Sequence, residues 1–367
     1  MNLYLTDKPT LSRRVFLRTG LASVAGYYLL PMTKPLNVRA ETSTQLRGEA
    51  DYCIFLFLTG GASQLDTFDL KEGRWTPPEY DIRTIKPGIV MPYGLFPRLS
   101  DQVEHFAMAR CVEAWESSHV RGVYYMQAGH PFSPARQREV PAVGAVVAYE
   151  FLNRRKSSDF LPPFVAMNLG AGSLIKEGCL PSEASPLALD MRQESPFVVS
   201  QKEKSIFDRR WKLLQQLRGG IGAGTSPESK PYQEWANYYG GAYNLMSSPR
   251  VSQILTVEEE DHKRYGNSAL GDGCVVARNL LKANAGTRYI VISHNGWDLH
   301  ANMFDRNAKV NHYTLCKELD SALSSLVADL ISHKLADGNS LLDKTFLICT
   351  GEFGRTGGEL TVNKGRD

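Results

Sequence analysis

The sequence predicts an α/β fold with a mainly parallel β-sheet. Uninterrupted apolar runs of strand length occur at 51–58, 288–293 and 344–350, and 162–168 is a shorter candidate. Apolar residues at every position, instead of every second position, are typical of strands that are buried on both faces of a parallel sheet. We therefore expect these four runs to be strands of one buried sheet.

Amphipathic helices are predicted between these strands. Within 312–335 the leucines recur at intervals of three and four residues, which places them on one helix face: Leu315, Leu319, Leu323, Leu326 and Leu330. A strand, a helix and a strand in this order form a βαβ unit. Segments 140–152 and 271–283 are predicted as further helices that pack on the sheet.

The length of 367 residues allows one large α/β domain with insertions or two domains. We expect a domain at 41–367, in which the segment 169–250, richer in glycine, serine, proline and charge, is an insertion or cap. The composition, with 43% hydrophobic and 22% charged residues, is that of a globular protein and not of a disordered or fibrous one. The six cysteines show neither a zinc motif nor a disulfide framework.

Residues 1–40 have the pattern of a twin-arginine secretory signal. Arg13-Arg14 precedes an apolar stretch over 20–32, and Val38-Arg39-Ala40 is a small-residue cleavage site. The stretch is shorter than the roughly 20 residues of a membrane anchor, so we expect export by the twin-arginine machinery, cleavage, a periplasmic or extracellular location and no stable membrane span. The segment holds six of the 42 Lys and Arg residues and one of the 39 acidic residues, so its removal changes the net charge from +3 to −2. That balance excludes the basic footprint of a nucleic-acid-binding protein.

Polar residues collect where three predicted strands end. These strands lead into the segments TGGASQLDTFD, HNGWDLH and GEFGRT. Ligands of open parallel sheets bind beyond the carboxyl ends of the strands, so we expect one composite site there. Asp298 and His300 are two residues apart, point to the same side of an extended backbone, and suit zinc, manganese or iron. The alternative is that His300 is hydrogen-bonded to Asp298 and only fixes a loop.

Four other residues are candidates for this site. Asp66 follows Gly60-Gly61 and is either part of a ligand site or a helix cap. Glu352 and Arg355 follow the third strand, and Arg355 would hold an anionic group unless the two residues form an internal ion pair. His119 lies at a predicted helix start, where a polar cluster presents a nucleophile, binds an anion or only caps the helix. Other histidines are expected at the surface or at caps: His105, His262, His312 and His333.

The chain resembles an exported family known as domain of unknown function 1501 in the order of several motifs. These are LTGGASQLDTFDLK, FPRLSDQVEHFAMARCVE, SSHVRGVYYMQAGHP, YGNSALGDGCVVARNLLKA, GWDLH and GEFGRT followed by NKGRD. The resemblance covers the chain from about residue 48 to its end. The family is considered related to the alkaline phosphatase and sulfatase superfamily, which implies a three-layer α/β/α sandwich, alkaline phosphatase-like, with metal ligands at the strand ends.

The resemblance also implies roles for individual residues. Asp66, Asp298, His300 and Glu352 would ligate one or two divalent metal ions, zinc being expected, with Asp367 as a further ligand. His119 falls near the nucleophile position, and Arg355 would act in catalysis. Glu352-Phe353 departs from the Asp-His of the superfamily, and the C/S-x-P-S-R sulfatase signature is missing, so formylglycine chemistry is not expected. The family typically continues past Asp367 with a histidine, so we expect a C-terminally truncated chain.

Two functions follow as expectations. The first is a metal-dependent hydrolase of sulfate or phosphate esters, with an anionic ester or a sulfated polysaccharide as its partner. The second is a non-catalytic exported binding or envelope protein that retains the fold. Fold alone does not decide between them, because related folds carry unrelated functions.

Overall fold

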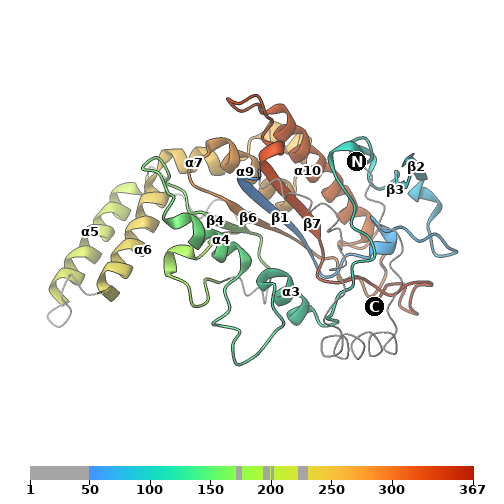
Figure 1. Ribbon diagram of the computed structural model, residues 1–367, viewed down its shortest axis with the longest axis horizontal. Coiled ribbons are helices and arrows are strands. Elements are labelled where there is room, and N and C mark those ends of the chain that lie inside the picture. The colour runs from blue at the N-terminus through green and yellow to red at the C-terminus, as the bar shows by residue number, and fades with distance from the viewer. Residues whose placement is uncertain (1–48, 171–175, 193–198, 200–201, 222–229) are drawn as a thin grey trace, which may run out of the picture. The chain divides into compact units, whose positions relative to one another are not determined.

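A computed structural model describes the chain outside residues 1–48, 171–175, 193–198, 200–201 and 222–229 (Figure 1). The predicted secretory signal lies outside the described residues. In the described part, five strands form one sheet whose hydrogen-bonded neighbours are all parallel. In sheet order the strands are β5 (Leu187–Leu189), β4 (Phe164–Met167), β6 (Tyr289–Asn295), β1 (Tyr52–Thr59) and β7 (Thr345–Thr350).

The predicted α/β class and the four predicted strands are confirmed. The sheet is entirely parallel, where a mainly parallel one was expected. β5 was not predicted, because three residues at a sheet edge carry no recognisable pattern. The expected βαβ unit is present as β6, α10 (His312–Ser332) and β7, but β1 lies between its two strands.

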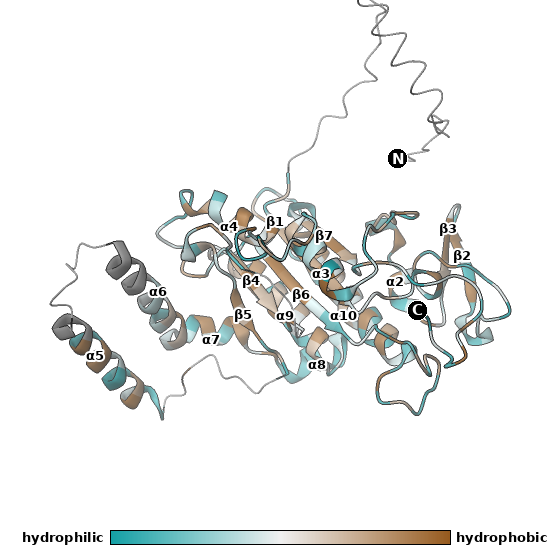
Figure 2. Ribbon diagram, turned by 90° about the horizontal axis from the view of Figure 1, so that it is seen from below, coloured by the Kyte–Doolittle hydropathy of each residue, from teal (hydrophilic) through white to brown (hydrophobic). Residues whose placement is uncertain are grey.

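Helices cover both faces of the sheet because its strands are apolar on both faces. Along β1, Ile54, Leu56 and Leu58 point to the face covered by α10 and α9 (Ala269–Ala283). Phe55 and Phe57 point to the face covered by α3 (His119–Ala128) and α4 (Val143–Leu152). Figure 2 shows the strands in the colour of hydrophobic residues. Each such buried side chain stabilises the fold by about 1.5–3 kcal/mol.

The helices predicted at 140–152, 271–283 and 312–335 are confirmed as α4, α9 and α10. A capping box of Asn311 and Thr314 sets the start of α10, and the helix ends at Ser332, three residues before the predicted end. The other elements are shorter: η1 (Gln64–Asp66), η2 (Pro78–Tyr80), β2 (Ile82–Lys86), β3 (Ile89–Pro92), α2 (Pro97–Ser100), η3 (Val103–His105), η4 (Ser182–Ala184), α7 (Pro249–Leu255), α8 (Glu259–Tyr265) and η5 (Leu342–Lys344).

The segment 169–250, expected to be an insertion or cap, contains β5 and two longer helices, α5 (Lys204–Ile221) and α6 (Lys230–Ser247). The two helices lie side by side (Figure 1). Their contact is aromatic: Phe207 and Trp211 of α5 stack on Tyr243 of α6, with ring centroids 5.4 and 4.9 Å apart. The role of this segment stays a prediction. Among the described residues, no helix is both long enough and apolar enough to span a bilayer.

The strand register determines where the loops meet. Thr59 of β1 pairs with Asn295 of β6, and Phe57 of β1 pairs with Thr350 of β7. All three strands therefore end at one edge of the sheet, and the segments that follow them emerge together. This is the edge at which the sequence predicts a composite site.

Candidate functional site

Three predicted site residues come together at this edge of the sheet. His119 at the start of α3 and Asp298 and His300 in the loop after β6 each offer a ligand atom, and these atoms lie within 4.8 Å of one another. Gly60, directly after β1, allows the close approach. Its φ is +109°, and a Cβ atom there would lie 2.5 Å from the backbone nitrogen of Asp298. A side chain at position 60 would therefore push the loop after β6 away from β1.

The carboxylate of Asp298 is the centre of this group. Its Oδ1 atom lies 3.2 Å from Nε2 of His119 and 2.8 Å from Nε2 of His300, and Arg355 donates a hydrogen bond to the same oxygen. Burial alone would raise the pKa of Asp298, but the hydrogen bond from Arg355 and the charges around it lower the pKa overall. Asp298 is therefore ionised at neutral pH and can act as a ligand or hydrogen-bond acceptor.

Each imidazole also faces a second carboxylate. Nδ1 of His119 lies 2.8 Å from Oε1 of Glu352, and Nδ1 of His300 lies 2.8 Å from Oδ1 of Asp367. A carboxylate next to Nδ1 holds the proton on that nitrogen, so that Nε2 carries the lone pair. Both lone pairs then point toward Asp298.

The electrostatics of the group call for added positive charge. With neutral imidazoles, the three carboxylates and the one guanidinium of Arg355 give these residues a net charge of −2. Nε2 of His300 and Oδ1 of Asp298 are only 2.8 Å apart, and two lone pairs at that distance repel unless a proton or a cation lies between them. The group can therefore hold one divalent cation or two additional protons.

Glu352 holds the imidazole of His119 in place. Its carboxylate is buried and accepts hydrogen bonds from the backbone N–H of Gly60 at 2.9 and 3.1 Å, besides its contact with His119. In this arrangement Glu352 orients the imidazole of His119 instead of joining the group around Asp298. Its predicted role as a ligand of a second metal ion stays a prediction.

Arg355 ties together the segments that follow β1, β6 and β7. Nε donates to the carbonyl of Gly61 at 2.8 Å, and Nη2 donates to the carbonyl of Gly60 and to Asp298. Nη1 faces the carbonyl of Arg366 and Nε2 of His300, both at 3.3 Å. The ion pair is thus made with Asp298 and not with Glu352. Four of the five N–H groups donate to oxygen atoms of the protein, and the fifth faces Nε2 of His300. The predicted action of Arg355 on an anion stays a prediction.

Asp66 lies outside the group around Asp298. Its carboxylate is 1% exposed and accepts hydrogen bonds from Nε of Arg366 at 2.5 Å, Nη2 of Arg366 at 3.2 Å and the hydroxyl of Ser63. Arg366, also 1% exposed, donates further to two backbone carbonyls. Asp66 therefore belongs to a buried ion pair, and its predicted role as a metal ligand stays a prediction.

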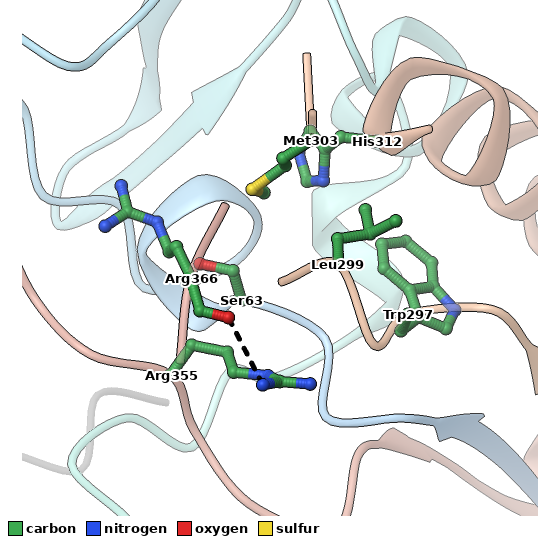
Figure 3. Close-up of a pocket in the computed structure, with 7 residues that line it drawn as sticks. All are labelled: Ser63, Trp297, Leu299, Met303, His312, Arg355 and Arg366. Atoms are coloured by element: carbon green, nitrogen blue, oxygen red, sulfur yellow. Dashed lines mark hydrogen bonds between the residues drawn. The ribbon is translucent and has the colours of Figure 1, made fainter. Parts of the chain in front are cut away.

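A small cavity lies beside this ion pair (Figure 3). Its volume of about 10 Å³ is close to the space that a single water molecule needs. Seven residues line it: Ser63, Trp297, Leu299, Met303, His312, Arg355 and Arg366. The space is too small for a substrate, so this cavity belongs to the packing behind the site.

A larger cavity, of about 240 Å³, opens directly onto the group around Asp298. Its lining comes from the ends of β1 and β6, from the first turns of α3 and from the loop after β7. The residues are Thr59, Gly60, His119, Val120, Val123, Gly170, Asn295, Gly296, Asp298 and Glu352. Sequence reasoning missed Asn295, although it is the last residue of β6 and lies inside the HNGWDLH motif.

His312 was expected at the surface or at a cap, and this prediction is wrong. The residue begins α10 but is fully buried, where Nε2 donates to the backbone carbonyl of Asp66 at 3.0 Å. Burial lowers the pKa of His312 from its usual 6.5 to about 4. A polar residue in a first helical turn resembles a cap in sequence, and the pattern gives no sign that this one points inward.

We expect the buried His312 to make the protein acid-sensitive. Unfolded chains protonate this residue below pH 6.5, whereas the folded protein resists protonation down to about pH 4. The stability present above pH 6.5 is therefore lost as the pH falls through this window, by at most about 1.4 kcal/mol per pH unit. Urea unfolding between pH 4 and 7 measures the slope, and His312→Asn should flatten it. An identical slope in both proteins would contradict the assignment.

Comparison with known proteins gives a family but no function. Residues 50–367 match the family described as "Protein of unknown function (DUF1501)". No curated protein and no solved structure matches the chain. The matched range contains the whole sheet and every candidate site residue.

Proposed function

Because the chain belongs to the DUF1501 family, for which no function is known, we propose a function from the geometry of its site. His119, Asp298 and His300 form a divalent-cation centre, and the protein hydrolyses sulfate or phosphate esters in the cavity above it. One observation carries the proposal: two imidazoles direct Nε2 at one carboxylate oxygen while a second carboxylate holds each Nδ1. Histidine ligands of metal ions are held in this way.

The three side chains fit a zinc ion better than a larger cation. Two imidazoles and one carboxylate are a common donor set of catalytic zinc, which binds nitrogen and oxygen at about 2.0–2.2 Å. Two donors of a tetrahedral ion then lie about 3.3 Å apart, close to the 3.2 and 2.8 Å between Asp298 and the two histidines. The side chains are 37%, 44% and 50% exposed, so a substrate or water molecule could reach a cation that these residues would hold.

The surrounding residues would position an ester. A cation at this centre supplies polarisation of an ester oxygen and activation of water near neutral pH. Thr59 and Asn295 line the cavity and offer a hydroxyl and an amide for hydrogen bonds, while Val120 and Val123 form an apolar wall for the organic part. No lysine or arginine is among the lining residues that are described. The negative charge of a substrate is therefore balanced at the cation centre.

Ester hydrolysis is supported further by the relation to alkaline phosphatases and sulfatases that the family resemblance implies, because the metal ligands of that superfamily also follow the strand ends. The pattern in residues 1–40 supports export by the twin-arginine route to the periplasm or beyond. A sulfated polysaccharide or another anionic ester outside the cytoplasm fits both features. Asp66, Glu352, Asp367 and Arg355 keep supporting roles in this proposal, as parts of the frame around the centre.

A second candidate is a binding protein that retains the fold without turnover. The observation in its favour is that Arg355, the residue best suited to bind an anion, already donates four of its five N–H groups to oxygen atoms of the protein. Such a protein would bind an anionic ligand at the cation centre and release it unchanged.

A panel of sulfate and phosphate esters tests the proposal. The full chain, loaded with zinc or manganese, is expected to hydrolyse at least one class, and Asp298→Ala is expected to lose this activity because the central ligand is gone. Equal activity in both proteins would mean that the turnover comes from a contaminant. Saturable binding of sulfate or phosphate without turnover across the panel would favour the binding protein instead.

A further inference from the structure

Helix α5 carries an apolar stripe that no described segment covers. Ile206, Leu213 and Leu217 are 43%, 53% and 50% exposed. Their spacings of seven and four residues place them on one face of the helix. Scattered single apolar residues are normal on a protein surface, whereas an aligned row on one helix is the pattern of a docking face.

The stripe points away from the partner helix. Phe207 and Trp211 stack on Tyr243 of α6, and the hydroxyl of Tyr243 donates to Asp208 at 2.8 Å. At 100° per residue, Trp211 and Asp208 lie on the face opposite to Ile206, Leu213 and Leu217, and Phe207 lies between the two faces. The pairing with α6 is therefore already satisfied, and the stripe remains available for another partner.

Positive charge flanks the stripe. Arg209 and Arg210 lie on either side of it, Lys212 lies one step further round, and all three are exposed. Over 202–217 the sequence contains five basic and two acidic residues, one of which, Asp208, is bound by Tyr243. A partner of this face must accept cations as well as apolar side chains.

We propose that α5 docks on an anionic lipid bilayer, lying in the plane of its surface. Ile206, Leu213 and Leu217 enter the boundary between headgroups and acyl chains, and the flanking arginines contact lipid phosphates, as in interfacial amphipathic helices. A second copy of the chain is the less favourable occupant, because it would bring Arg209 and Arg210 of both copies together. This surface is independent of the proposed ester hydrolysis.

Vesicle sedimentation with the full chain tests the proposal. Binding is expected to vesicles that contain phosphatidylglycerol, to weaken as salt increases, and to be absent with phosphatidylcholine alone. Arg209→Gln with Arg210→Gln should weaken binding about thirtyfold. Leu213→Ser with Leu217→Ser should weaken it about tenfold or more. These positions are exposed, so circular dichroism should show unchanged folding.

Matched controls come from exposed residues elsewhere. Val112→Ser and Arg138→Gln change an exposed apolar and an exposed basic residue outside α5, and each should bind vesicles like the unmodified chain. An equal loss of vesicle binding in the control variants and in the α5 variants would overturn the proposal. So would equal binding to both vesicle types, or a dimer in sedimentation velocity that Leu213→Ser dissociates, since the face would then belong to a second copy.

Discussion

Replacing Asp66 by alanine is expected to destabilise the protein by about 3–5 kcal/mol, the cost of leaving one partner of a buried ion pair without the other. Both Asp66 and Arg366 are 1% exposed. Without the carboxylate, the guanidinium of Arg366 keeps only its bonds to the carbonyls of Thr356 and Gly358. Equilibrium unfolding in urea measures the loss of free energy.

A surface pair provides the control for Asp66. Arg74 and Glu359 form an ion pair whose side chains are 90% and 61% exposed, so Glu359→Ala should leave the unfolding midpoint unchanged. Equal stability of the Asp66→Ala protein and the unmodified chain would contradict the buried pair. The metal content of the Asp66→Ala protein separates the two roles of Asp66. If Asp66 is only an ion-pair residue, the variant is less stable but still binds the metal. If Asp66 is a metal ligand, the variant loses the metal.

Replacing Asp298 by asparagine is expected to weaken zinc binding at least about a hundredfold. Zinc sites contribute about 10–16 kcal/mol through four ligands, or roughly 3 kcal/mol for each one. The binding free energy lost in the Asp298→Asn protein should exceed this average contribution of one ligand, because Asp298 is the only carboxylate among the three ligand candidates. Competition with a chromophoric chelator measures the affinity.

Two further variants make the Asp298 result specific. Glu352→Gln keeps an acceptor for the N–H of Gly60 but weakens the hydrogen bond to Nδ1 of His119. Its zinc affinity should therefore fall less, by about tenfold to a hundredfold. Asp69→Asn alters an acid of the TGGASQLDTFD segment that pairs with Lys71 at 2.9 Å, and the zinc affinity of this variant should be unchanged. Equal affinities in the Asp298 and Asp69 variants would rule out Asp298 as a ligand.

The fold was largely predictable because its central strands are apolar on both faces. β1 and β6 are recognisable from composition alone, and α10 from its leucine spacing. β5, with three residues, was not predictable. Its place at the sheet edge depends on pairing with β4, a contact between distant segments that leaves no local pattern.

The residues of the candidate site could be named from the sequence, but their partners could not. Asp298 and His300 stand out because polar residues follow a buried strand. The contact of His119 with Glu352 joins residues 233 positions apart, and only the tertiary fold places the start of α3 against the loop after β7. Arg366 is the clearest failure of sequence reasoning, because an arginine in a polar segment is normally exposed, whereas this one is buried in an ion pair with the distant Asp66.

The divalent-metal content of the purified full chain tests the central claim most directly. The protein is expected to bind about one equivalent of zinc or a similar ion, and cobalt in its place should give the absorption of a site with nitrogen and oxygen donors. The Asp298→Asn protein should lose both signals. A folded chain that retains less than about a tenth of an equivalent, or an Asp298→Asn protein with undiminished metal, would contradict the account.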